Sequence, residues 1–115
     1  MKFVTHNDEY VNNNMTSLVG YIDANYAELC SLFGQPEEEV CDKVDWEWII
    51  RFNDGTIATI YNWKNGPGYG YYSTRAVNIN HWHVGGHDAR ALELIHKVIW
   101  DNRQKKHFPD LTPAA

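Results

Sequence analysis

The segment from Lys43 to Lys64, KVDWEWIIRFNDGTIATIYNWK, constrains the fold most strongly, because it has the pattern of two β-strands joined by a tight turn. Asp54-Gly55 is typical of a two-residue type I′ turn, in which both central residues have positive φ. Side chains alternate between the two faces of a strand, so the turn fixes which residues share a face. The predicted register pairs Phe52 with Ile57, Ile50 with Thr59, Trp48 with Tyr61 and Trp46 with Trp63. The hairpin would then carry most of its aromatic residues on one face.

Two further strands and two amphipathic helices are predicted around this hairpin. Ser17 to Ile22 is expected to be a strand, followed by a helix that Asp23 caps. Ala76 to Val84 is expected to be a strand that Gly85-Gly86 terminates, and Asp88 to cap the last helix. The residues that would form one face of each helix are Tyr26, Leu29, Cys30 and Phe33, and then Leu92, Ile95, His96 and Ile99. The sequence predicts a small α+β domain of order β-α-β-β-β-α, with two helices packed on an antiparallel sheet of three to four strands.

The domain organisation follows from length and pattern. The chain has 115 residues, enough for one domain with its own core. Residues 1–15 show little periodicity and contain three consecutive asparagines, so we expect a flexible leader there. Residues 16–107 are expected to form the single α+β domain, and residues 108–115 a C-terminal tail.

Charge and hydropathy narrow the class of protein. The formal net charge is −5, whereas a protein that binds nucleic acid directly normally presents a basic patch. The charge favours a partner protein with a basic surface instead. No apolar run approaches the roughly 20 residues that span a bilayer, and residues 1–10 lack the apolar region of a signal peptide. We therefore expect a cytosolic monomer or homodimer that uses no cofactor, membrane or nucleic acid.

His81, His83 and His87 are the candidate metal ligands in the sequence. His81 and His83 would point the same way on a strand, and with His87 they would offer three imidazoles to Zn²⁺ or another divalent ion. A fourth ligand is not obvious, and a metal site also needs hydrogen bonds that orient its ligands. The favoured interpretation is that the histidines are hydrogen-bonded or exposed side chains and that no metal is bound.

Two groups of residues are candidates for contacts with a partner. The acidic group consists of Glu37, Glu38, Glu39, Asp42, Asp45 and Glu47, and the aromatic group of Tyr69, Tyr71 and Tyr72 on a glycine-rich loop. Carboxylates suit a basic groove, and tyrosines on a loop suit an adaptable contact surface. Alternatively, Asp45 and Glu47 are an acid–base pair or ordinary surface residues that pair across the hairpin, and the tyrosines fold back over the sheet.

Four stretches carry a resemblance to a known group of proteins: SLVGY at 17–21, LFGQP at 32–36, the segment from Trp48 through DGT to IYNWK at 60–64, and WHVGG at 82–86. They fall within residues 16–95 and resemble a family of small uncharacterised proteins encoded by tailed bacteriophages. These motifs are structural, so the resemblance carries over no catalytic residue. It implies a phage accessory protein made in the bacterial host cytoplasm. Such proteins often bind and block a host protein, including defence systems such as CRISPR effectors.

The leading hypothesis is thus a non-enzymatic, phage-encoded interaction protein that binds and inhibits a bacterial host protein, for example a defence complex that handles nucleic acid. One alternative is a sponge for a nucleotide signal, with an aromatic pocket made by Trp63, Tyr71 and Trp82. The other is a metal-dependent enzyme built on His81, His83 and His87.

Overall fold

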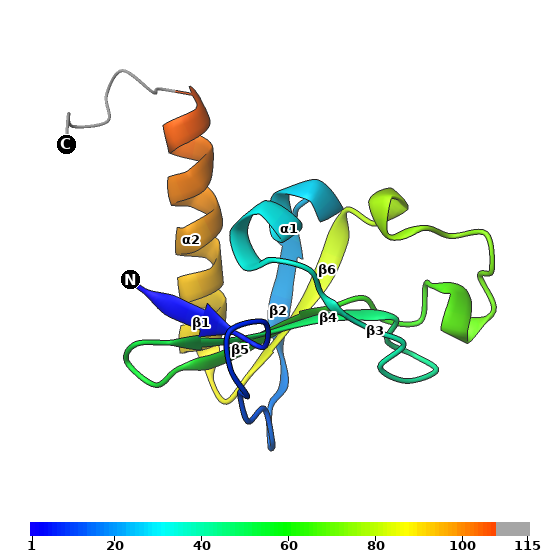
Figure 1. Ribbon diagram of the computed structural model, residues 1–115, viewed down its shortest axis with the longest axis horizontal. Coiled ribbons are helices and arrows are strands. Elements are labelled where there is room, and N and C mark those ends of the chain that lie inside the picture. Colours follow the sequence, from blue (N-terminus) through cyan, green and yellow to red (C-terminus); the bar gives the residue numbers. More distant parts are fainter. Residues whose placement is uncertain (108–115) are drawn as a thin grey trace.

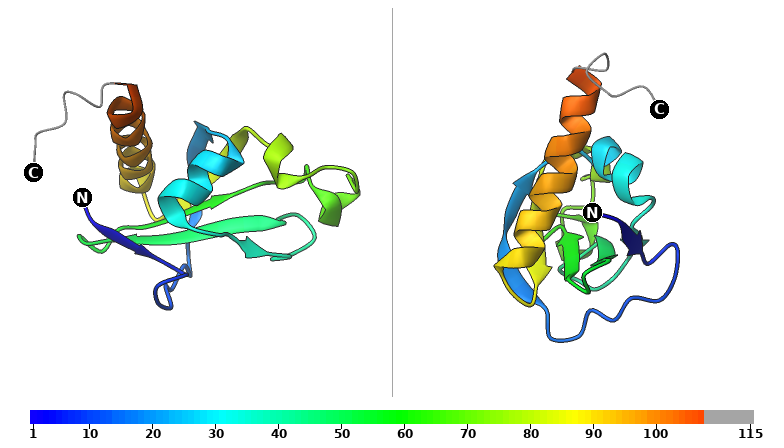
Figure 2. Two further views of the ribbon diagram at one scale, coloured as in Figure 1. Left: turned by 45° about the horizontal axis from the view of Figure 1, so that its top comes forward. Right: turned by 90° about the vertical axis from the view of Figure 1, so that its left-hand side faces the viewer.

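The computed structural model describes residues 1–107, and the predicted tail at 108–115 lies outside the described residues. It confirms the α+β class: a six-stranded antiparallel sheet carries two helices on one face (Figures 1 and 2). The strands are β1 (Phe3–Thr5), β2 (Ser17–Asp23), β3 (Glu37–Glu38), β4 (Trp46–Phe52), β5 (Ile57–Tyr61) and β6 (His81–Gly86). The helices are α1 (Tyr26–Phe33) and α2 (Ala89–His107), and the short 3-10 helices η1 (Pro67–Tyr69) and η2 (Ala76–Asn78) lie between β5 and β6.

The strand order β1-β4-β5-β6-β2 places the first two strands of the chain at opposite edges of the sheet, and β3 pairs with the remainder of β4 beside β1. The predicted four strands are β2, β4, β5 and β6, to which β1 and β3 are added. The connection at 6–16 must therefore cross the sheet, and it does so on the face away from the helices (Figure 2). Within it Val11 is buried, and Glu9 forms an ion pair with Arg51 of β4. Starting the domain at residue 16 was thus wrong, because residues 1–15 supply a strand and this crossing.

The hairpin β4–β5 forms, but in a register one residue away from the predicted one. Trp48 lies opposite Ile60 and Ile50 opposite Ala58. The loop has three residues instead of two: the N–H of Phe52 donates to the carbonyl of Thr56, and Gly55 alone adopts a positive φ, +91°. A turn followed by a left-handed glycine is the usual three-residue hairpin loop. The alternation of β5 did not reveal the shift, because Ile57, Ala58, Thr59 and Ile60 are all buried and both faces of the strand are covered.

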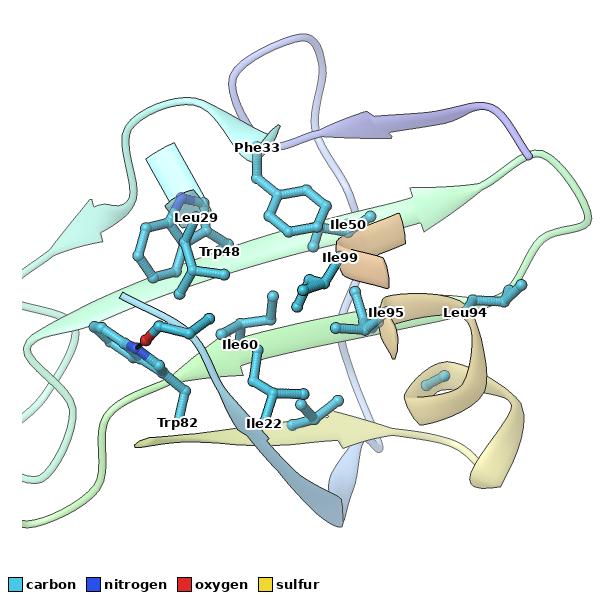
Figure 3. Close-up of a cluster of buried hydrophobic side chains, with 14 of the residues drawn as sticks. Ile22, Leu29, Phe33, Trp48, Ile50, Ile60, Trp82, Leu94, Ile95 and Ile99 are labelled. Atoms are coloured by element: carbon cyan, nitrogen blue, oxygen red, sulfur yellow. Dashed lines mark hydrogen bonds between the residues drawn. The ribbon is translucent and has the colours of Figure 1, made fainter. Parts of the chain in front are cut away.

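The core lies between the sheet and the two helices (Figure 3). Trp48 and Trp82 meet edge to face, with ring centroids 5.3 Å apart, and both are fully buried. Their indole N–H groups donate to the carbonyls of Gly34 and Ala24, at 2.8 and 3.0 Å, so no polar atom of either ring is left unpaired. The helices contribute Leu29, Phe33, Ala91, Leu94, Ile95 and Ile99, whereas His96, expected on this stripe, is exposed.

The strand expected at Ala76 to Val84 starts later and ends later, because η2 occupies 76–78 and β6 includes both predicted strand-breaking glycines. The neighbours explain why glycines belong there. A Cβ on Gly85 would lie 2.5 Å from Thr59 Oγ1, and a Cβ on Gly86 would lie 2.4 Å from the Cβ of Ala91 in α2. Glycine allows the adjacent strand and helix to approach β6 closely.

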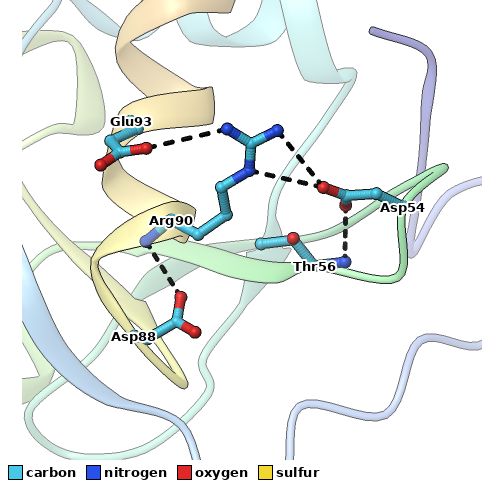
Figure 4. A network of polar contacts seen from close by, with 5 residues as sticks. All are labelled: Asp54, Thr56, Asp88, Arg90 and Glu93. Atoms are coloured by element: carbon cyan, nitrogen blue, oxygen red, sulfur yellow. Dashed lines mark hydrogen bonds and ion pairs between the residues drawn. The ribbon is translucent and has the colours of Figure 1, made fainter.

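The helix caps are partly as predicted. Asp88 accepts a hydrogen bond from the N–H of Arg90 at 2.9 Å and begins α2, whereas Asn25, not Asp23, caps α1 by accepting from Glu28 N at 2.8 Å. The Arg90 side chain then reaches Asp54 in the hairpin loop, with Nε and Oδ2 3.4 Å apart (Figure 4). Asp54 also accepts from Thr56 N at 2.9 Å, so the loop is tied both to its own strand and to the start of α2.

Candidate interaction surface

A buried pair of polar residues organises the end of the sheet at which the predicted partner-binding residues lie. Asn62 follows β5 and is 1% exposed. Its Oδ1 accepts hydrogen bonds from the backbone N–H groups of Asp45 and Trp46, at 2.8 and 2.9 Å. Its Nδ2 donates to Asp45 Oδ2 and to Asn65 Oδ1, both at 3.0 Å. All four hydrogen-bonding positions of the amide are used, which fixes its orientation.

Asp45 extends this network into the glycine-rich loop. Its Oδ1 accepts from the backbone N–H of Gly68 at 2.8 Å, while its Oδ2 accepts from Asn62. A Cβ on Gly66 would lie 1.9 Å from Asp45 Oδ2, and one on Gly68 would lie 3.0 Å from Asp45 Oδ1. The Gly-Pro-Gly sequence is thus required where the loop packs on this carboxylate, and the base of the tyrosine loop is anchored to the start of β4.

The anchoring creates a groove of about 550 Å³ between the β3–β4 connection and the base of the tyrosine loop. It is lined by Glu38, Glu39, Cys41, Asp45, Trp46, Pro67 and Gly68. Glu38, Glu39 and Asp45 of the acidic group line it directly, and the loop that bears the tyrosines contributes Pro67 and Gly68 at its base. Sequence reasoning proposed the two groups separately, and the structure joins them through Asp45 and Asn62.

The predicted contact residues differ in how far they are available to a partner. Glu37, Glu38, Glu39 and Asp42 are exposed, as are Tyr69, Tyr71 and Tyr72, of which Tyr72 is 85% exposed. Asp45 is 8% exposed and uses its carboxylate for Asn62 and Gly68, so it supports the surface from beneath instead of contacting a partner. These bonds also leave no support for an acid–base pair of Asp45 with Glu47.

Glu47 lies on the sheet face away from the helices. The register places it opposite Glu37 on one side and opposite Tyr61 on the other. Burial, with a smaller contribution from the charge of Glu37, raises the pKa of Glu47 to about 6. This carboxylate is therefore set apart from the exposed acidic residues of the groove rim.

The three candidate metal ligands do not converge. His81 and His83 share the face that bears Glu47, and His81 Nδ1 lies 2.7 Å from Asp23 Oδ1. His87 lies beyond β6, where its Nε2 is 2.9 Å from the carbonyl oxygen of Asn14. Within residues 1–107, no three His, Cys, Asp or Glu side chains are grouped so as to hold a metal ion. Burial lowers the pKa of His83, and the neighbouring His81 adds to that effect.

Sequence reasoning missed a cluster on this same face, which we call the aromatic row: Tyr21, Tyr61, Trp63, His81 and His83. The predicted hairpin register puts Tyr61 and Trp63 on the same face as Trp48, which the structure shows to be the core face. The pocket expected from Trp63, Tyr71 and Trp82 does not form, because Trp82 is fully buried under the helices and Trp63 lies on the other face. The sequence does place Tyr21 and His83 each on one face of its own strand. That they lie side by side could be inferred only from the pairing of β2 with β6.

The fold and these surfaces define an α+β protein with a two-helix layer on one sheet face and an aromatic row on the other. In comparisons with protein-family models, curated proteins and solved structures, nothing matches this chain. No helix in the part of the chain that the structure describes has the length and apolar character needed to cross a membrane.

Proposed function

We propose that the protein is a non-enzymatic interaction protein that binds and inhibits a partner protein through the groove described above. The partner presents a basic surface to Glu38, Glu39 and Asp42, and Tyr71 and Tyr72 provide the apolar contacts. The resemblance to small phage proteins makes a bacterial host protein the target, such as a defence complex that handles nucleic acid. The site of action is then the host cytoplasm.

The observation that carries this proposal is the Asp45–Asn62 network. It fixes an acidic rim and the base of a tyrosine-bearing loop as one surface before any partner arrives. Preorganised surfaces lose less conformational entropy on binding, and exposed aromatic side chains are frequent energetic centres of interfaces. Acidic rims chiefly raise the association rate with a basic partner and make it dependent on salt.

The test begins with capture of the target from the bacterial host, followed by binding kinetics at two salt concentrations. Reversal of Glu38 and Glu39 to Lys should slow association, and more so at low salt, because exposed charges act over only about 8 Å at physiological ionic strength. Glu37 is left unchanged because its charge acts on Glu47. The matched control reverses Glu93 and Asp101 on α2, which changes the net charge by the same amount away from the groove.

The tyrosine contribution is tested separately. Tyr72→Ala should raise the dissociation rate about tenfold or more if this side chain is an interface anchor. Tyr10→Ala is the control, because Tyr10 is 83% exposed and lies in the 6–16 connection. Equal effects of the groove variants and their controls, or an association rate that does not change with salt, would show that the partner binds elsewhere.

A further inference from the structure

The aromatic row is an exposed array of π-surfaces built across three strands. The registers place Tyr21 opposite His83 and His83 opposite Tyr61, so these three residues form one line across β2, β6 and β5. His83 is the centre of the array, with ring centroids 4.9 Å from Tyr21, 5.5 Å from Tyr61 and 6.2 Å from Trp63. The sheet itself therefore sets the spacing of the rings.

The ends of the row remain open. Tyr21 is 47% exposed and Trp63 is 41% exposed. Tyr21 stacks on His81 with ring centroids 5.2 Å apart and an angle of 17° between the planes. The 6–16 connection crosses the same sheet face but leaves these rings accessible. The row thus offers exposed flat surfaces on a rigid support.

Two lysines lie at the Trp63 end. The Nζ atoms of Lys43 and Lys64 are 5.8 and 5.7 Å from the centroid of the Trp63 ring, and Lys64 Nζ is 5.7 Å from that of Tyr69. The backbone keeps them together, because Lys64 N donates to the carbonyl of Lys43 at 2.9 Å. The acidic neighbours are Asp23, which is paired with His81, and Glu47, which lies opposite Tyr61. An anionic group would therefore be placed at the lysine end.

We propose that the aromatic row binds a nucleotide, whose base stacks on the exposed rings and whose phosphate is held by Lys43 and Lys64. Every nucleobase has a π-face that stacks on aromatic side chains, and lysine ammonium groups are compact partners for phosphate. A purely apolar ligand would use the rings but not the two lysines, and a free phosphate would use the lysines but not the rings. This site adjoins the tyrosine loop at Lys64 but shares no lining residue with the groove, and it goes beyond the proposed function.

The experiment is a titration of the full chain, followed by NMR shifts of backbone amides, with three probes: 5′-AMP, adenosine and ribose 5-phosphate. We expect 5′-AMP to bind with a dissociation constant below about 1 mM and more tightly than either fragment, because it alone has both groups. The largest shifts should fall in β2, β5 and β6. Absence of binding up to about 10 mM 5′-AMP would overturn the proposal, as would ribose 5-phosphate binding as tightly as 5′-AMP.

The variants locate the site. Trp63→Leu should weaken 5′-AMP binding about tenfold, as expected for loss of one stacking partner. Trp100→Leu should not change it, because Trp100 is a 62% exposed tryptophan on α2. Lys64→Asn, combined with Lys43→Gln, should reduce 5′-AMP binding to the level of adenosine, and Asn suits the φ of +58° at position 64. If the Trp63 and Trp100 variants bind 5′-AMP with equal affinity, the nucleotide does not bind at the aromatic row. If a six-nucleotide RNA binds but 5′-AMP does not, the ligand is not a mononucleotide.

Discussion

Asn62 and Asp45 hold each other through both side chain and backbone. The N–H of Asp45 donates to Asn62 Oδ1 at 2.8 Å, and Asn62 Nδ2 donates to Asp45 Oδ2 at 3.0 Å. Both residues are buried, and the pair joins the start of β4 to the end of β5 and to the glycine-rich loop. The candidate interaction surface therefore depends on two polar residues that are almost completely buried.

Asn62→Ala should lower the free energy of unfolding by more than about 2 kcal/mol. Two buried backbone N–H groups would lose their hydrogen-bond acceptor, and the buried Asp45 carboxylate would lose a donor. Urea unfolding measures this loss. Asn80→Ala is the control, since Asn80 is exposed and should change stability by less than about 0.5 kcal/mol. Similar urea midpoints for the two variants would show that the network contributes little.

Gly55→Ala should destabilise the protein by about 1 kcal/mol, because Gly55 has a φ of +91° that residues with a Cβ rarely adopt. The cost is backbone strain and not a clash, since no atom lies within 4 Å of the place a Cβ would occupy. Gly55→Asn should cost less, because asparagine tolerates this region best among the other residues. If alanine and asparagine shift the urea midpoint equally, the strain explanation is wrong.

Glu47→Gln should stabilise the protein at pH 8 but not at pH 4. The pKa of Glu47 is raised to about 6 in the folded state from its ordinary value of 4.5, so the folded state binds this proton more tightly than the unfolded state. Stability is thus lost as pH rises through this range. The variant avoids the loss, and we expect a gain of about 1 kcal/mol at pH 8, allowing for solvent screening. Urea unfolding of the parent protein and the variant at the two pH values measures this gain. If the free energy of unfolding differs between the two proteins by the same amount at both pH values, the pKa of Glu47 is not raised in the folded state.

Arg103→Gln should detach the C-terminal part of α2 from α1. Arg103 binds both carboxylate oxygens of Glu28 at 2.8 Å and also donates to the carbonyl of Asp23 at 2.7 Å. We expect a loss of about 1–2 kcal/mol at pH 7, because a bidentate pair with a largely buried Glu28 is stronger than an ordinary surface pair. Arginine lowers the pKa of Glu28, so the loss should shrink as pH falls below the ordinary range of a carboxyl group.

Lys97→Gln is the matched control for Arg103→Gln. Lys97 pairs with Asp101 one helical turn away on the exposed face of α2, and such pairs contribute about 0.3–0.5 kcal/mol. Thermal unfolding of the two variants compares a pair that links two helices with a pair within one helix. If both lose the same stability, the contact between α1 and α2 does not depend on Arg103.

The sequence predicted the parts of the fold that depend on local chemistry. The capping of α2 by Asp88 and the exposure of Glu37, Glu38, Glu39 and Asp42 follow from residue type, whereas residue type did not decide whether the loop tyrosines are exposed. What could not be predicted depends on pairing between distant segments. The register of β5 requires knowing that both of its faces are covered, and β1 pairs with β4 across nearly 50 residues. The aromatic row and the burial of Asp45 follow from those pairings, so neither was visible in the alternation of a single strand.

The two edges of the sheet are made first and its middle last. Asp23 in β2 and His81, its partner in β6, are 58 residues apart, and β6 lies between β5 and β2. A nascent chain that ends before β6 lacks the strand with which β2 pairs. The sheet can therefore be completed only after most of the chain has been synthesised, when β6 pairs with β5 and β2.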